Sequence, residues 1–145
     1  MLNICAKHQS AIKDKLKNFK LKVTPARLEL LDLLEHYESP VTIEKIGKLM
    51  KNKKVDFTTL YRNLESLKGL GLVREVSLNR SQAYYELADK PHHHHLICQT
   101  CGIIKDVSNC ATPKISDKTL IVNGFKKVDF HSLEFFGQCN KCSPK

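Results

Sequence analysis

Two pairs of cysteines with identical spacing are the residues best suited to chemistry in this chain. Cys98 and Cys101 form the first pair, directly after four consecutive histidines at 92–95, and Cys139 and Cys142 form the second. Four thiolates are the ligand set of a closed tetrahedral zinc site, and Cys-x-x-Cys spacing lets one turn supply two sulfurs. Because such a site has no open coordination position, we expect a structural zinc ion that stabilises a small domain. The alternative for the same residues is two disulfides or redox pairs.

The histidine run could serve two metal sites if it is extended, because successive side chains of a strand point to opposite faces. His93 and His95 would share one face, and Glu86 and Asp106 are the carboxylates that could return to it. Two imidazoles and two carboxylates suit iron(II), manganese(II) or zinc(II) and do not choose among them. The alternative is a hydrated, histidine-rich hinge. The opposite face would carry a second set, His92, His94 and His131.

The first half of the chain supplies the elements that would position these residues. Leucines recur at helical spacing from Pro25 to about His36, with Thr24 as N-cap, and a second amphipathic segment covers 42–50. A third helical pattern covers 56–71, and two strand-like runs, at 72–78 and 82–87, flank a turn at 79–81. Three helices followed by a hairpin predict a winged helix.

The third helical pattern points to nucleic acid. Its leucines at 60, 64 and 67 form one stripe, which leaves polar residues on the outward face. The recognition helix of a helix-turn-helix presents such residues to the major groove. The alternative is a surface helix with an ordinary polar face. The outward residues are Thr58, Thr59, Tyr61, Arg62 and Lys68.

Positive charge is concentrated at the amino terminus. The net charge is +9, and residues 1–27 hold seven Lys or Arg against one acid, Asp14, whereas residues 28–87 hold nine of each sign. We expect an extra basic helix near the phosphates of a nucleic acid, where it adds salt-sensitive affinity. The alternative is a solvated basic helix face.

Length and composition indicate the class of protein. A chain of 145 residues with 41% hydrophobic residues can fold as a globular protein. No apolar run approaches the roughly 18 residues of a membrane span, and the amino terminus lacks a secretory core, so we expect a soluble cytoplasmic protein with no membrane partner. Six cysteines then favour metal over disulfides, although Cys5 and Cys110 have no matching partners. A metalloenzyme is the rival hypothesis, but no catalytic base or nucleophile accompanies the histidines, and we expect no enzymatic activity and no small-molecule substrate.

Five motifs, in this order and spacing, resemble the ferric uptake regulator family of bacterial metal-dependent repressors over nearly the whole chain. They are LKVTPAR at 21–27, TTLYRNLESL at 58–67, YYEL at 84–87, HHHHLICQTCG at 92–102, and HSLEFFGQC through CNKC at 131–142.

The resemblance implies an α+β fold with three parts. A winged helix-turn-helix DNA-binding domain would occupy 1–87, a hinge 88–92, and a small α/β dimerisation and metal-binding domain 93–145. The protein would be a homodimeric repressor that binds a palindromic double-stranded DNA operator when its regulatory iron(II), manganese(II) or zinc(II) is bound.

The resemblance also implies roles for particular residues. Tyr61 and Arg62 match DNA-contacting positions, and Lys22 and Arg27 match basic positions near the DNA. The structural zinc ligands would be Cys98, Cys101, Cys139 and Cys142; the regulatory ligands Glu86, His93, His95 and Asp106; and those of a second, less universal site His92, His94 and His131.

The chain departs from the family pattern at two places. The family's fifth regulatory ligand, a histidine before the second DNA-binding helix, is replaced by Ser39 and Pro40, and His36 lies several residues too early. The glutamate of the second site aligns near Pro113, whose side chain cannot bind metal.

Two positions bear on which signal is sensed. Asp106 resembles the peroxide-sensing branch of the family, where the iron-sensing branch has Glu, and Glu86 stands where zinc sensors often have Cys. Iron, manganese, zinc and peroxide sensing therefore remain alternatives, together with metal-independent DNA binding by a protein with a structural zinc.

Overall fold

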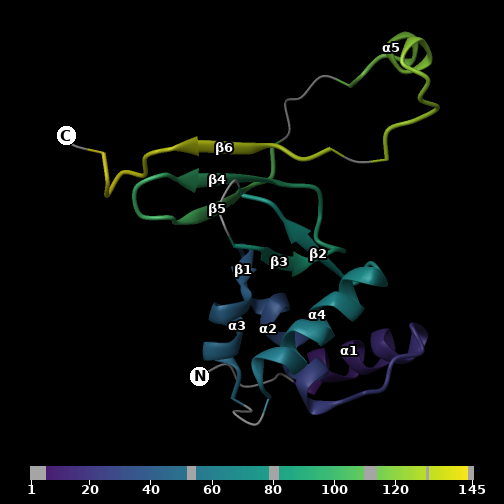
Figure 1. The fold of residues 1–145 in the computed structure, drawn as a ribbon, viewed down its shortest axis with the longest axis vertical. Coiled ribbons are helices and arrows are strands. Elements are labelled where there is room, and N and C mark those ends of the chain that lie inside the picture. Colours follow the sequence, from purple (N-terminus) through teal and green to yellow (C-terminus); the bar gives the residue numbers. More distant parts are fainter. Residues whose placement is uncertain (1–5, 52–54, 79–81, 110–113, 130, 144–145) are drawn as a thin grey trace. The chain divides into compact units, whose positions relative to one another are not determined.

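The computed structural model describes residues 6–51, 55–78, 82–109, 114–129 and 131–143 (Figure 1). By internal contacts the chain divides into two compact units, Met1–Lys90 and Pro91–Lys145. Among the described helices, none is long and apolar enough to cross a membrane. The first unit contains α1 (Ala6–Asn18), α2 (Pro25–His36), β1 (Val41–Thr42), α3 (Ile43–Leu49), α4 (Phe57–Gly69), β2 (Val73–Val76) and β3 (Tyr84–Leu87); the second contains β4 (His94–Cys98), β5 (Ile104–Val107), α5 (Asp117–Val122) and β6 (Glu134–Gly137). This mixed composition confirms the α+β class.

Side-chain caps fix where three helices of the first unit begin. Thr24 accepts a hydrogen bond from the backbone N–H of Arg27, and Pro25 occupies the first turn of α2, as predicted. Thr42 and Asp56 cap α3 and α4 in the same way. After α4 the chain reverses at Gly71, whose φ of 70° is a backbone conformation that favours glycine. The helix boundaries follow from local sequence.

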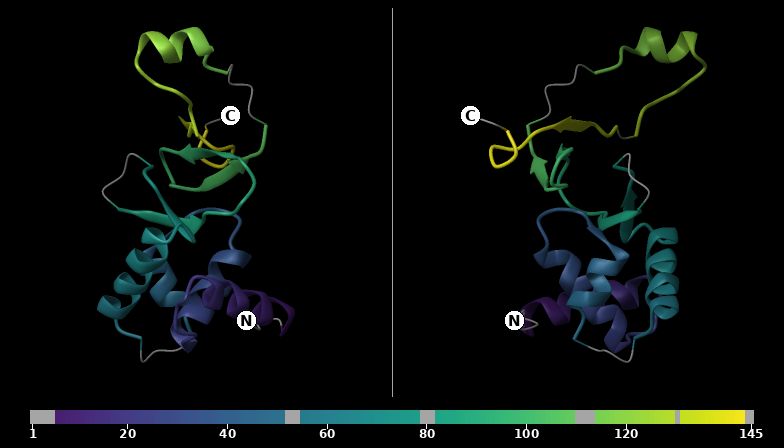
Figure 2. Two further views of the ribbon diagram at one scale, coloured as in Figure 1. Left: turned by 90° about the vertical axis from the view of Figure 1, so that its right-hand side faces the viewer. Right: turned by 60° about the vertical axis from the view of Figure 1, so that its left-hand side comes forward.

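The core of the first unit lies between its helices and its sheet. The leucine stripe of α4, predicted at Leu60, Leu64 and Leu67, is fully buried, and the basic helix α1 adds Ile12 and Leu16 to the same core. The views of Figure 2 show the four helices on one side of the sheet. The polar face of α4 therefore stands on a packed apolar base.

The first unit's sheet has the order β1-β3-β2, with both pairings antiparallel. Strands β2 and β3 lie within the two predicted runs, and the predicted turn at 79–81 lies outside the described residues. In this register Arg74 stands directly opposite Glu86. The sequence did not predict β1, which has only two residues.

The second unit's sheet has the order β5-β4-β6 and brings the histidine run beside two other segments. β5 is antiparallel to β4 and places Asp106 opposite His95. β6 runs parallel to β4 and places Gly137 opposite Cys98. β4 begins at His94, so the predicted extended conformation is confirmed from that residue onward.

Candidate metal centres and nucleic-acid interface

The four cysteines of the two Cys-x-x-Cys pairs meet in one cluster. Cys98 ends β4 and Cys139 follows β6, and because these strands are parallel neighbours, both pairs emerge at the same end of the sheet. The four Sγ atoms all lie within 4.8 Å of one another, and none of the four cysteines is in a disulfide. The Sγ atoms of Cys101 and Cys139 are 3.7 Å apart. Tetrahedral zinc with bonds of about 2.3 Å separates its sulfurs by about 3.8 Å, so the cluster fits this ion.

The thiols of this cluster and the backbone around them shift one another's pKa values. Backbone N–H groups of Cys101 and Cys139 lower the pKa of the Cys98 thiol to about 5. Hydrogen bonds with the thiols of Cys101 and Cys139 raise the pKa of Cys142 to about 12. Because zinc binds thiolates, metal binding at this cluster would release protons.

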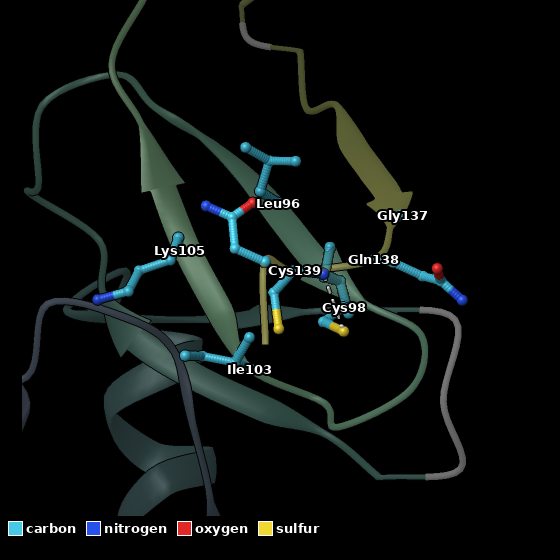
Figure 3. A pocket seen from close by; sticks show the side chains of 9 residues that line it. Leu96, Cys98, Ile103, Lys105, Gly137, Gln138 and Cys139 are labelled. Carbon is cyan, nitrogen blue, oxygen red and sulfur yellow. Dashed lines mark hydrogen bonds between the residues drawn. The ribbon is translucent and has the colours of Figure 1, made fainter. Parts of the chain in front are cut away.

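An open hollow of about 260 Å³ lies beside the cysteine cluster and has a largely apolar lining. Figure 3 shows Leu96, Ile103 and Lys105 around it, together with the side chains of Cys98 and Cys139. Leu96 and Ile103 are large apolar side chains that stay exposed. The second unit therefore presents apolar surface next to its cysteines.

His93, His95 and Asp106 converge on one side of the second unit's sheet. The Nε2 atom of His93 is 3.8 Å from Oδ2 of Asp106, and that of His95 is 3.9 Å from Oδ1. His93 donates a hydrogen bond from Nδ1–H to the carbonyl of Pro91 at 2.7 Å, so its Nε2 carries the lone pair. A metal-binding histidine is commonly oriented by such a bond. The group is suited to a divalent ion.

Glu86, predicted as the fourth ligand of this set, lies on β3 in the first unit. Its Oε1 accepts a hydrogen bond of 2.6 Å from Nε of Arg74, and Nζ of Lys90 lies 4.0 Å from Oε2. The buried carboxylate is thus paired with cations of its own unit. Its participation in a metal site remains a prediction.

His92, His94 and His131 are also brought together, with one ligand atom of each within 4.8 Å of the others. The Nε2 atoms of His92 and His94 are 3.2 Å apart. The backbone N–H of Leu133 donates to Nδ1 of His94 at 3.2 Å, so the proton of the neutral ring is on Nε2. That proton points toward His92 and would have to leave before Nε2 could bind metal. Pro113, aligned with the family's ligand, lies outside the described residues.

Four of the five residues predicted on the outward face of α4 are exposed, and its first turn is fixed by a cap. The fifth, Lys68, is half-buried and paired with Glu65 and Glu75. Tyr61 is 50% exposed, and Thr58 and Arg62 are exposed beside it. The Thr59 hydroxyl donates to Asp56 at 3.2 Å, so it already has a partner within the chain. The Thr59 backbone N–H lowers the pKa of the Asp56 carboxyl. This face can contact phosphates or base edges.

Arg27 has a structural role that the sequence did not reveal. Its Nη1 donates to the carbonyl of Lys22 at 2.9 Å, and its Nε donates to the Asn63 side chain at 3.1 Å. Arg27 thereby connects the segment before α2 to the middle of α4. Of the two predicted basic residues, Lys22 lies in the segment before α2 and Arg27 lies in the first turn of α2.

A further group of possible ligands, His8, Asp32 and His36, lies between α1 and α2 in the first unit. The only signal in the sequence is Asp32, a charged residue inside the leucine run 30–34. Cys5 and Cys110 lie outside the described residues.

Comparisons with known proteins show the family of this chain. The family model for "Ferric uptake regulator family" matches residues 18–136. The ferric uptake regulation protein of Neisseria meningitidis is 33% identical over 133 residues, which cover 90% of this chain and 92% of that protein. The peroxide operon regulator of Bacillus subtilis is 30% identical over 132 residues, covering 90% of each chain. The crystal structure of the Vibrio cholerae ferric uptake regulator gives a TM-score of 0.73 at 25% identity, covering 88% of this chain and 98% of that one.

Proposed function

Because this chain belongs to the ferric uptake regulator family, we propose that it is a metal-responsive transcriptional repressor that binds a palindromic DNA operator as a homodimer. The convergence of His93, His95 and Asp106 carries this proposal, because it supplies a place where a divalent ion can act as the signal. Family membership favours a regulator over a metalloenzyme. The repressor acts in the cytoplasm, where its DNA partner lies.

The first unit is the DNA-binding domain, a winged helix with α4 as its recognition helix. The exposure of Thr58, Tyr61 and Arg62 above a buried leucine stripe supports this role. Thr59 contributes mainly through its bond to the cap, and Lys22 and Arg27 add positive charge near the amino end of α2. The Vibrio cholerae relative likewise has DNA-binding domains.

The cysteine cluster is a structural zinc site. It connects the turn after β4 to the turn after β6, and so ties the end of the chain to the central strand of the second unit. A zinc ion held by four thiolates supplies folding free energy rather than reactivity.

The regulatory ion is iron(II), manganese(II) or zinc(II), held by His93, His95, Asp106 and Glu86. Only seven positions separate Glu86 from His93 along the chain, so the two units can contribute to one site. His93 already offers its Nε2 lone pair, whereas the tautomer of His94 places a proton on the corresponding nitrogen. We therefore assign regulation to this set and a lesser role to His92, His94 and His131.

Metal binding would couple to DNA binding by restricting how the two units move. Ligands from both units favour the arrangement in which the ion is fully coordinated, and that arrangement gains population when it also fits the operator. DNA affinity and metal affinity must then rise by the same factor. Moving a population from 1:99 to 99:1 requires about 5.5 kcal/mol of differential metal binding, within the range of several good ligands.

The second unit supplies the dimer interface. Large apolar side chains are exposed on its strands, on α5 and in the segments that flank them, more than a small free-standing unit needs. A second copy of the chain is the partner that this surface fits, because a palindromic operator requires two-fold symmetry. The exposed residues are Leu96, Ile103, Ile115, Ile121, Val122, Phe125, Val128, Phe135 and Phe136.

Fluorescence anisotropy under anaerobic conditions tests the proposal. Zinc-loaded protein is titrated against DNA from its own promoter and against a family-type palindrome, with iron(II), manganese(II) or zinc(II) added separately. We expect at least one ion to tighten binding tenfold or more, about 1.4 kcal/mol of coupling. The preferred ion identifies the signal, and release of DNA when peroxide is added to the iron complex would identify peroxide sensing, which Asp106 favours.

The double variant His93→Ala, His95→Ala should lose the metal response while keeping its structural zinc. The matched control is His92→Ala, His131→Ala, which removes two exposed histidines of the other set. Metal-dependent binding that survives in the first variant would rule out the proposed site. Equally tight binding in the presence of a chelator too weak to strip the thiolates would instead indicate a metal-independent DNA-binding protein.

A further inference from the structure

We propose that His8, Asp32 and His36 form an additional binding site for a first-row divalent metal, such as zinc(II) or nickel(II), that fastens α1 to α2. His8 comes from α1, and Asp32 and His36 from α2. One ligand atom from each residue lies within 4.8 Å of the other two. All three residues lie on α1 and α2, which carry none of the proposed regulatory ligands, so the site is separate from that set and does not depend on the proposed function.

Asp32 is the first reason to expect a cation here. Its side chain is only 4% exposed, within a helix whose neighbouring positions are buried leucines. Its Oδ1 atom is buried and makes no hydrogen bond within the part of the chain that the structure describes. The Nδ1 atom of His36 lies 3.7 Å from this oxygen, which is too far for a hydrogen bond. A buried carboxylate oxygen without a hydrogen bond is unfavourable, and a bound metal ion is one of the groups that can offset this cost.

His36 is oriented as a metal ligand would be. Its Nδ1–H donates a hydrogen bond of 2.7 Å to the carbonyl of Asp32, so Nε2 carries the lone pair. Histidines that bind metal commonly donate their other ring N–H to a carbonyl in this way. Positions 32 and 36 are also four residues apart, which places both side chains on the same face of α2.

His8 completes the set from the neighbouring helix. The centroid of its ring lies 5.1 Å from that of His36, and the two rings are inclined at 59°. Ligands about 2.1 Å from a shared ion lie about 3.4 Å apart in tetrahedral geometry, so the ligand atoms would have to approach one another by up to about 1.4 Å. Two imidazoles and one carboxylate form a borderline ligand set that suits zinc(II) or nickel(II).

The surroundings leave room for the rest of a coordination shell. A hollow of about 190 Å³ borders His8 and is lined also by Lys15, Glu35 and Asp89. Lys15 and Asp89 form an ion pair there, so their charges offset each other. Water can reach the ion from this side and supply the ligands that the protein does not.

A bound ion would add a contact to a helix that contributes few buried side chains to the core. α1 contributes Ile12 and Leu16 to the core, and most of its other described side chains are exposed. An ion shared with α2 would hold the amino end of α1, which is opposite the end followed by the turn at 19–20. Bound metal should therefore suppress the opening of α1.

Hydrogen exchange measured by mass spectrometry on the full chain tests this inference. The cysteine site is first loaded with zinc, and the exchange of peptides covering 6–18 is then compared with and without additional zinc. At a free zinc concentration 100 times the dissociation constant, exchange through opening of α1 should slow about a hundredfold. His8→Gln should abolish this protection and reduce the number of bound zinc ions by one.

Two controls separate this site from other effects of zinc. Asp14→Asn, at an exposed position of α1 outside the ligand set, should retain the protection and the full number of ions. His93→Ala, His95→Ala should also retain the protection of α1. Unchanged protection and stoichiometry in His8→Gln would overturn the inference, as would the absence of zinc-dependent protection in the wild type. Because His8 is exposed, its replacement should leave the circular dichroism spectrum unchanged.

Discussion

His93 and His94 are adjacent in the chain, yet hydrogen bonds give their rings opposite roles. His93 donates through Nδ1 to Pro91 and presents a lone pair at Nε2. His94 accepts at Nδ1 from Leu133 and therefore carries its proton on Nε2. A cation can bind the first ring without disturbing its contacts, whereas binding to Nε2 of the second would require the ring to lose a proton or the bond to Leu133 to break. Neighbouring identical residues are thus distinguished by their partners.

Arg74 should weaken the metal affinity of the proposed regulatory site. Its Nε atom lies 2.6 Å from Oε1 of Glu86, so the guanidinium competes with a metal ion for that carboxylate. The Arg74 side chain is 38% exposed, and solvent screening reduces this pair to about 1 kcal/mol. Arg74→Gln should accordingly raise metal affinity about fivefold, as measured by competition with a chromophoric chelator. Lys105→Gln, an exposed cation on β5, is the control. Unchanged or weaker affinity in Arg74→Gln would exclude Glu86 as the ligand that Arg74 restrains.

Among the helices, the amino end of α4 should affect both the stability of the protein and its binding of DNA. Asp56 caps the turn that carries Thr58, Thr59, Tyr61 and Arg62, so loss of the cap should fray the residues proposed to touch DNA. Asp56→Ala should lower both Tm and operator affinity, with Asp14→Ala on α1 as a control that has no capping role.

The contribution of this cap should depend on pH with a definite sign. The pKa of Asp56 is lowered in the folded chain from its ordinary value of 3.8, chiefly by the Thr59 backbone N–H. The stabilisation is therefore complete above the ordinary value and is lost as the pH falls through the lower, folded value. The difference in Tm between wild type and Asp56→Ala, followed by circular dichroism, should shrink in that acidic range. A difference that grows on acidification would contradict the assigned pKa shift.

The elements that the sequence predicted are those specified by local residues. The leucine periods of both helices and the cap Thr24 are local patterns, so α2 and α4 could be located from the sequence, although Asp56 was not predicted as the cap of α4. β1 could not, because its two residues are ordered by pairing with β3, more than 40 positions away. The hydrogen bond between Arg27 and Asn63 could not be predicted for the same reason, because no local sequence pattern links α2 to α4.

The candidate sites also differ in whether a local sequence pattern predicts them. The cysteine pairs and the alternation of the histidine run are local patterns, and both were legible in the sequence. Asp106 was named as a candidate because it follows the first cysteine pair closely, and antiparallel pairing of β4 with β5 places it opposite His95. His8 and Asp32 are 24 positions apart on different helices, and only the packing of α1 on α2 brings them together. Asp32, a charged residue inside the leucine run, was the only indication of this group in the sequence.

Basic residues and exposed apolar residues are concentrated in different units of the molecule. Basic residues are concentrated in the first 27 positions, seven against one acid, and the large apolar side chains of α5 and β6 are exposed in the second unit. A basic surface suits the phosphates of DNA, and an apolar surface suits a second protein chain. The proposed repressor needs both, because a palindromic operator is bound by two copies whose separation matches the half-sites.

The dimer proposal predicts the effect of changing α5. Ile121 and Val122 are 74% and 79% exposed, so their replacement should not disturb the fold of a single chain. Ile121→Asp, Val122→Asp removes apolar area that a dimer would bury and places carboxylates in the interface. Burying such side chains is worth roughly 1.5–3 kcal/mol each, so the dimer dissociation constant should rise at least about a hundredfold, as measured by analytical ultracentrifugation. Operator affinity should fall with it, because a monomer can contact only one half-site.

Lys118→Asp, on the same helix but at a polar position, should stay dimeric. A dimer of unchanged affinity in the double variant would show that α5 lies outside the interface, and would leave the strand residues Phe135 and Phe136 as the surface to change next.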